Sequence, residues 1–225
     1  FCAGVGQLLF QLPSLYRIDL VPRPRWDSRH AGVRRILKLM LPALFGVSVS
    51  QLNLLFDTVL ASFLPAGSVS WLYYSDRLTE LPLGVFGIAI ATVLLPSLSA
   101  DADSFSATLD WSLRCILLIA IPATAALVLL AEPILATLFQ YGKMEARDVT
   151  MAAFSLRAYA LGLTAFMLIK ILAPGFYARE DTRTPVRIGI FAMVANMGLN
   201  VVFVVPLHLF LGIGHVGLAL ATSVA

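Results

Sequence analysis

The sequence predicts an all-α, polytopic transmembrane helical bundle, and three observations lead to this class. Of its 225 residues, 59% are hydrophobic and only 13% are charged, whereas a soluble domain carries about 25% charge. The mean hydropathy is +0.87. The apolar residues also gather in blocks of about 20, the length of helix that crosses a hydrocarbon core of about 30 Å. This composition argues against a soluble enzyme and against nucleic acid as a partner. The net charge of +3 fits basic loops at a membrane surface.

Taken in chain order, hydropathy predicts about five full membrane helices between two partial ones. The opening segment, 1–15, is typical of the end of a membrane helix, and the closing segment, 212–225, would reach only about 21 Å as a helix. Both ends therefore predict an interior piece of a longer protein. The complete spans are expected at about 36–64, 69–96, 111–131, 151–175 and 186–206. Prolines lie inside or near the ends of several spans, where neighbouring helices or water must satisfy the freed carbonyls.

Charges in the loops predict the orientation of these spans. The segment Arg17–Lys38 holds seven basic residues against two acidic ones. The loop 177–185 contains Arg179 and Arg183, which places it on the same side. By the positive-inside rule, loops 16–35, 97–110 and 177–185 are cytoplasmic. The predicted organisation is a helix end at 1–15, a basic cytoplasmic loop at 16–35 and a helical region at 36–225.

A few charges fall inside a predicted span, where each costs at least ~2.5–3.5 kcal/mol at the bilayer centre. In the second complete span, Arg77 and Glu80 share a helix face, Asp76 is adjacent, and Tyr73 lies one turn earlier. Gly84 and Gly87 are expected to extend the same stripe. One interpretation is that these charges neutralise one another and hold helices together. The other is a cationic site that faces a cavity, since an arginine can bind phosphate or pyrophosphate bidentately.

A second set of polar residues recurs at helical spacing. Gly46, Ser50, Asn53 and Asp57 form a stripe in the first complete span, and Asn196 and Asn200 share a face of the fifth. Thr222 lies in the last, partial helix. One carboxylate with amide and hydroxyl oxygens could bind a small cation such as Na⁺, and the same set could equally be a hydrogen-bonded network between helices. Any other cofactor is not expected.

The chain holds no sequence motif of bond-breaking chemistry. His-Glu-x-x-His, Gly-x-Ser-x-Gly, Walker and Cys-x-x-Cys patterns do not occur in it. We therefore predict that the chain is not an enzyme. An alternative is a membrane enzyme that acts on polyprenyl phosphates, with Asp76 or Glu80 as its base.

Several motifs along the chain resemble those of the MurJ (MviN) lipid II flippase family. They keep their order across essentially the whole sequence: Gln7–Pro13, Gly46–Gln51, Gly67–Leu78, Leu94–Ser99, Leu138–Gly142 and Leu172–Tyr177. The resemblance implies a MATE-like lobe of the MOP exporter superfamily. The chain would hold the end of helix 6, helices 7 to 11 and the start of helix 12, which is nearly the whole C-terminal lobe.

The resemblance also implies a function. Family members translocate the undecaprenyl-pyrophosphate-linked peptidoglycan precursor, lipid II, from the inner to the outer leaflet of the bacterial inner membrane, in cell wall biogenesis. The family's cavity arginine and glutamate match Arg77 and Glu80, with Asp76 adjacent. A Na⁺ site in some members lies on the helices of Asp57, Asn196, Asn200 and Thr222. The expected partners are lipid II and membrane lipids, and the expected state is a monomer. The alternative is a related exporter of a polysaccharide precursor or a drug.

Overall fold

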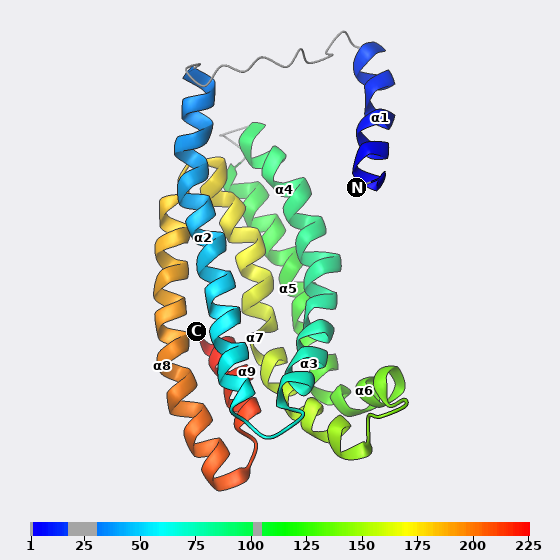
Figure 1. Ribbon diagram of the computed structural model, residues 1–225. Helices are drawn as coiled ribbons and strands as arrows, with labels where there is room; N and C mark the ends of the chain where they lie inside the picture. The colour runs from blue at the N-terminus through cyan, green and yellow to red at the C-terminus, as the bar shows by residue number, and fades with distance from the viewer. Residues whose placement is uncertain (1, 18–30, 101–104) are drawn as a thin grey trace. The chain divides into compact units, whose positions relative to one another are not determined.

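The computed structural model describes residues 2–17, 31–100 and 105–225, and every regular element in these ranges is a helix (Figure 1). The expectation of an all-α fold is therefore confirmed. The elements are α1 (Cys2–Arg17), α2 (Ala31–Ser62), α3 (Ser68–Pro82), η1 (Leu83–Ile88), α4 (Ala89–Ala100), α5 (Phe105–Leu129), α6 (Ala131–Phe139), α7 (Ala146–Ala178), α8 (Arg183–Leu211) and α9 (Gly214–Val224).

The chain forms two compact units, Phe1–Lys38 and Leu39–Ala225. The first contains α1 and the start of α2, and the second contains every residue of the candidate site. Most of the predicted loop 16–35 lies outside the described ranges, so its expected role as a cytoplasmic connection stays a prediction.

Four helical segments of the described chain are long and apolar enough to cross a membrane. They are Ser68–Leu94, Phe105–Leu129, Ala146–Ala178 and Arg183–Leu211, and they coincide with the predicted spans at 69–96, 111–131, 151–175 and 186–206. The predicted span at 36–64 is occupied by α2, a continuous helix of 32 residues. Several helices run past the predicted bounds, because hydropathy marks only the part that crosses the hydrocarbon core. The chain is a multi-pass membrane protein.

The structure corrects two of the expected elements. The second span is not a single α-helix, because η1, a π-helix, separates α3 from α4. Pro82 lacks a backbone N–H, and Gly84 and Gly87 are weak helix formers, so this stretch accepts the wider turn. The stretch 132–148, which lies between the predicted spans 111–131 and 151–175, contains the nine-residue helix α6. Its Pro133 lies in the first turn, where a missing N–H costs no helical hydrogen bond.

Helix α7 occupies the centre of the second unit and contacts α3, η1, α4, α5, α6, α8 and α9. Its buried residues are mostly small, which allows neighbouring backbones to approach closely. A Cβ on Gly162 would lie 2.8 Å from Cα of Ser223 on α9. On α9 itself, a Cβ on Gly217 would lie 2.8 Å from the backbone of Val204 on α8. Two glycines thus bring α9 into direct backbone contact with α7 and α8.

On α8, large apolar side chains are exposed and amide side chains are buried, which is the reverse of a helix in a water-soluble protein. Phe191, Leu209 and Phe210 are among its exposed side chains, with 77%, 72% and 84% of their surface accessible. Asn196 and Asn200 are buried on the same helix. A helix with apolar residues outward and amides inward is suited to a lipid environment, where polar groups must find partners inside the protein.

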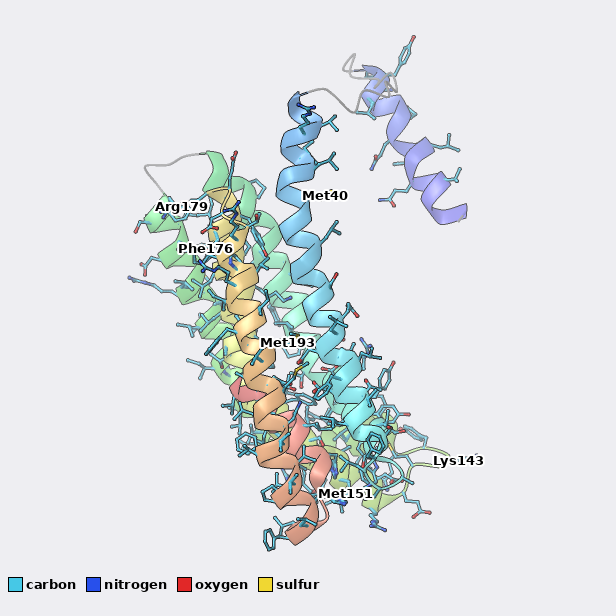
Figure 2. The ribbon with its side chains drawn as sticks, turned by 60° about the vertical axis from the view of Figure 1, so that its left-hand side comes forward. Met40, Lys143, Met151, Phe176, Arg179 and Met193 are labelled. Carbon is cyan, nitrogen blue, oxygen red and sulfur yellow. The ribbon has the colours of Figure 1, made fainter. Side chains whose placement is uncertain are left out.

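The two ends of α7 are held by different contacts. At the end near Lys143 and Met151, the indole Nε1 of Trp71 on α3 donates a 3.0 Å hydrogen bond to Asp148. At the opposite end, near Phe176, the guanidinium of Arg179 lies 4.2 Å from the ring centroid of Phe105 on α5. Lys143 and Arg179 therefore lie near opposite ends of α7 (Figure 2).

Candidate functional site in a charged cavity

A cavity of about 530 Å³ lies between α2, α3, α7 and α9. Its wall combines apolar side chains with a concentration of charged and polar ones that is unusual for a membrane helix bundle. The lining residues are Asn53, Leu54, Asp57, Thr58, Ala61, Val69, Leu72, Tyr73, Asp76, Arg77, Glu80, Tyr159, Leu218 and Thr222. Both groups of residues singled out in the sequence therefore contribute to one cavity.

Arg77, Glu80 and Asp76 of α3 all line this cavity. The guanidinium Nη1 of Arg77 forms an ion pair with Oε2 of Glu80, one helical turn away, as the i,i+3 spacing predicts. Both side chains remain about half exposed, at 53% and 50%. Tyr73, one turn earlier, places its ring centroid 5.0 Å from Cζ of Arg77. The guanidinium thus faces the cavity between an aromatic ring and a carboxylate.

Arg77 is the single basic residue in the described lining of the cavity, which also contains Asp57, Asp76 and Glu80. An arginine keeps its charge under all physiological conditions and offers a planar array of N–H donors. The guanidinium of Arg77 is therefore the cationic group of a wall whose other charged side chains are acidic.

Tyr159 of α7 is a cavity residue that sequence reasoning missed. It lies in the lining with Asp57 and Asp76 and interacts electrostatically with both carboxylates. A tyrosine in a long apolar helix carries no spacing signal of its own. Only the packing of α7 against α3 and α9 shows that it faces the cavity.

Asp57 is the meeting point of the second group of residues. Its Oδ1 accepts a 2.7 Å hydrogen bond from Nδ2 of Asn200 on α8, and its Oδ2 accepts a 3.3 Å bond from Nδ2 of Asn53. Nδ2 of Asn200 also donates to Oδ1 of Asn196 at 2.9 Å. Nδ2 of Asn196 in turn donates to Oγ1 of Thr222 at 3.3 Å. The four predicted residues therefore come together from α2, α8 and α9.

Two oxygen atoms of this network lack hydrogen-bond partners. They are Oδ1 of Asn53 and Oδ1 of Asn200, both buried. A buried amide oxygen without a partner is costly, because desolvation is not repaid. These amide oxygens, the carboxylate of Asp57 and the hydroxyl of Thr222 are all hard oxygen donors, the kind that small cations prefer.

The structure does not place every residue of the two predicted stripes in the cavity wall. Gly87 does not continue the cavity-facing stripe of Arg77 and Glu80, because η1 changes the helical register. It is buried, and a Cβ there would lie 3.6 Å from Cγ of Lys170 on α7. The surroundings of Gly46 and the side chain of Ser50 are not among the parts of the chain that the structure describes.

The turn between α7 and α8 contains Asp181, whose carboxylate accepts several hydrogen bonds. Asp181 accepts hydrogen bonds from the hydroxyl of Thr184 at 2.6 Å and from the backbone N–H groups of Thr184 and Arg183 at 3.0 and 3.1 Å. These bonds, that of the Thr184 hydroxyl first, hold the pKa of Asp181 below its usual value. Asp181 thereby satisfies the first N–H groups of α8.

Long apolar helices packed around a charged cavity define a multi-pass α-helical membrane protein. The family model described as lipid II flippase MurJ matches residues 1–225. The chain belongs to the MurJ lipid II flippase family, as the sequence motifs indicated.

Curated relatives agree with this assignment. The chain is 54% identical to the probable lipid II flippase MurJ of Vibrio cholerae, over all of this chain and 43% of the relative. It is 49% identical to the lipid II flippase MurJ of Burkholderia cenocepacia, over 98% of this chain and 43% of the relative. The chain thus spans less than half the length of these relatives.

Solved structures show the same fold. The structure of lipid II flippase MurJ in an inward closed conformation superposes with a TM-score of 0.75 at 29% identity, over 92% of this chain and 44% of that one. An outward-facing MATE family transporter of the MOP superfamily gives a TM-score of 0.65 at 22% identity, over 84% and 41%. The second match concerns the fold alone.

Proposed function

We propose that this chain is the cavity-forming part of a lipid II flippase of the bacterial inner membrane, in which Arg77 binds the pyrophosphate of the lipid. The observation that carries the proposal is the position of Arg77, which is half exposed to a cavity inside a bundle of membrane helices. A pyrophosphate offers several acceptor oxygens, and the guanidinium can bind two of them at once. The apolar lining leaves the lipid tail in a hydrocarbon environment.

The proposed cycle is alternating access of this cavity to the two sides of the membrane. In it Arg77 exchanges its ion pair with Glu80 for contacts with the phosphate oxygens. Glu80 neutralises the guanidinium while the cavity holds no anion, which lowers the cost of a charge among membrane helices. Nothing in this cycle breaks a covalent bond, so in this proposal the protein acts as a transporter and not as an enzyme. The proposal also takes the protein to act as a monomer and without nucleic acid. Loops 16–35, 97–110 and 177–185 are cytoplasmic in this proposal.

Replacement of Arg77 by alanine in the full-length protein tests the proposal. Loss of a charged hydrogen-bond donor costs about 1.5–3 kcal/mol, so lipid II affinity should fall by about 10- to 150-fold. Lipid II translocation in proteoliposomes should fall with it. Arg114→Ala is the matched control, because Arg114 also pairs with an acid on its own helix, Asp110, but lies outside the cavity lining. Unchanged translocation by Arg77→Ala, in protein that is folded and inserted, contradicts the proposal.

We also propose that Asp57, Asn196, Asn200 and Thr222 bind Na⁺. The buried, unpartnered amide oxygens of Asn53 and Asn200 support a cation over a network that is closed by hydrogen bonds alone. A bound cation would supply a positive charge to the Asp57 carboxylate, whose hydrogen-bond partners are amide and hydroxyl groups. The residues themselves hold α2, α8 and α9 together around it.

A test of the cation site does not depend on transport. Na⁺ added in place of choline should raise the melting temperature of the full-length protein, since a ligand that binds the folded state stabilises it. The variant Asp57→Asn keeps the shape of the side chain and removes its charge, so its Na⁺-dependent shift should disappear. An equal shift in this variant and in the unmodified protein contradicts the assignment.

A further inference from the structure

The guanidinium of Arg77 is restrained from two directions by residues of its own helix. Tyr73, Arg77 and Glu80 are spaced i, i+4 and i+7, so their side chains lie on one face of α3. Glu80 forms an ion pair with Nη1, and the ring of Tyr73 lies 5.0 Å from Cζ. All three residues line the same cavity.

The two restraints have opposite consequences for an anionic ligand. The carboxylate of Glu80 uses the same N–H donors that a phosphate requires, so an anion must displace it. An aromatic ring instead interacts with a cation through its negative π face and offers no competing acceptor oxygens there. The Tyr73 ring can therefore hold the guanidinium of Arg77 while the N–H groups of the guanidinium turn toward a ligand.

The ring of Tyr73 is itself supported, although 54% of the residue is exposed. It meets the ring of Tyr74 edge-on, with centroids 5.9 Å apart and an angle of 73°. The ring of Tyr74 in turn lies 4.8 Å from that of Phe139 at the end of α6. A chain of aromatic rings thus connects the cavity arginine to a second helix.

We propose that Tyr73 is a positioning residue for the anionic headgroup, because it holds the Arg77 guanidinium in the cavity after Glu80 has released it. This inference rests on the proposed function of the cavity. Pre-positioning reduces the conformational freedom that a long side chain loses when it binds, and so strengthens binding. The inference assigns this role to the ring of Tyr73, and because the hydroxyl also interacts with Arg77, the experiment separates the two groups.

Substitution of the ring tests the inference in the full-length protein, with the dissociation constant of lipid II as the readout. Tyr73→Leu should weaken binding about 2- to 30-fold, the range expected for one cation–π contact. Tyr73→Phe keeps the ring and should remain within about 2-fold of the unmodified protein. In a double-mutant cycle, Tyr73→Leu should have no further effect once Arg77 is alanine, since its contribution passes through the guanidinium.

A matched control is available elsewhere in the chain. The guanidinium of Arg157 lies 5.8 Å from the ring of Phe154, outside the cavity lining. Phe154→Leu should leave the affinity for lipid II unchanged. Melting temperatures of all variants separate a loss of binding from a loss of fold.

The outcomes distinguish this inference from the function on which it rests. Equal weakening by Tyr73→Phe and Tyr73→Leu overturns it, because the hydroxyl would then be the contributing group. Additive effects of Tyr73→Leu and Arg77→Ala overturn it as well. If Arg77→Ala weakens binding and Tyr73→Leu does not, the positioning role fails and the function stands. If Arg77→Ala has no effect on binding, the proposed function fails first.

Discussion

Asn200 on α8 donates a 2.7 Å hydrogen bond from Nδ2 to Oδ1 of Asp57 on α2, across 143 residues of sequence. The bond joins two helices that are far apart in the chain and places both residues beside the charged cavity. It is also the shortest contact of the network in which Asn53, Asn196 and Thr222 take part.

Replacement of Asn200 by alanine should lower the stability of the full-length protein. The change removes donors to Asp57 and Asn196 and leaves a buried carboxylate with fewer partners. A loss of about 1–3 kcal/mol is expected, the cost of an unsatisfied buried polar group. Equilibrium unfolding in detergent measures it. Asn53→Ala is the milder comparison, because its bond to Asp57 is longer at 3.3 Å, and a larger loss for Asn53→Ala contradicts this ranking.

Replacement of Gly217 by alanine should destabilise the contact between α8 and α9. The new Cβ would lie 2.8 Å from backbone atoms of Phe203 and Val204, which cannot move aside as a flexible side chain could. Overpacking of this kind costs about 1–3 kcal/mol. Gly198→Ala is the control on α8, since nothing lies within 4 Å of its Cβ position. Melting temperatures should fall for Gly217→Ala alone, and a similar fall for both variants contradicts the prediction.

Replacement of Trp71 by phenylalanine should weaken the junction of α3 with the start of α7. The indole N–H donates to Asp148, whose other oxygen accepts the backbone N–H of Glu145 at 3.0 Å. A hydrogen bond to a charged group contributes about 1.5–3 kcal/mol, and the lost ring volume adds to the cost. Asp148→Asn keeps an acceptor oxygen for the indole and should lose less. Urea or thermal unfolding compares the two variants.

The start of α8 should become less protected at acidic pH. The bonds to Asp181 require its ionised form, and they hold its pKa below the usual value of about 3.9. A group with a lowered pKa in the folded state stabilises that state above its unfolded pKa, and the contribution is lost as pH falls through the folded value.

Amide hydrogen exchange at Arg183 and Thr184 measures this effect. After correction for intrinsic rates, protection should fall as the pH drops below about 3.9. Thr184→Val removes the hydroxyl donor and so raises the folded pKa of Asp181, and the loss of protection should therefore be smaller and be complete at a higher pH. Protection that is independent of pH in the unmodified protein contradicts the assignment of Asp181 as the group that caps α8.

Much of the fold follows from periodicity and hydropathy, and the limits of that reasoning are local. The ion pair of Arg77 with Glu80 was predictable because spacing within one helix fixes which side chains share a face. The π-helix η1 was not, since a single inserted residue in a turn leaves almost no trace in hydropathy. Helix α6 was missed because nine residues fall short of a membrane span.

The candidate site was predictable only in part, for a related reason. Asp57, Asn196, Asn200 and Thr222 were each visible as polar residues in apolar helices, yet their meeting depends on tertiary packing. The sequence did not indicate Tyr159 as a cavity residue, because its position in the lining depends on how α3 and α9 pack against α7. The roles of these residues in binding remain predictions that the experiments above test.

The two glycine contacts of α9 limit how the protein can change shape. A rotation of α9 about its own axis would drive a side chain of that helix into the backbone of α7 or α8, where a Cβ already has no room at Gly162 and Gly217. We therefore expect α7, α8 and α9 to move together in any change of conformation. Distances between spin labels placed on these three helices should therefore stay constant.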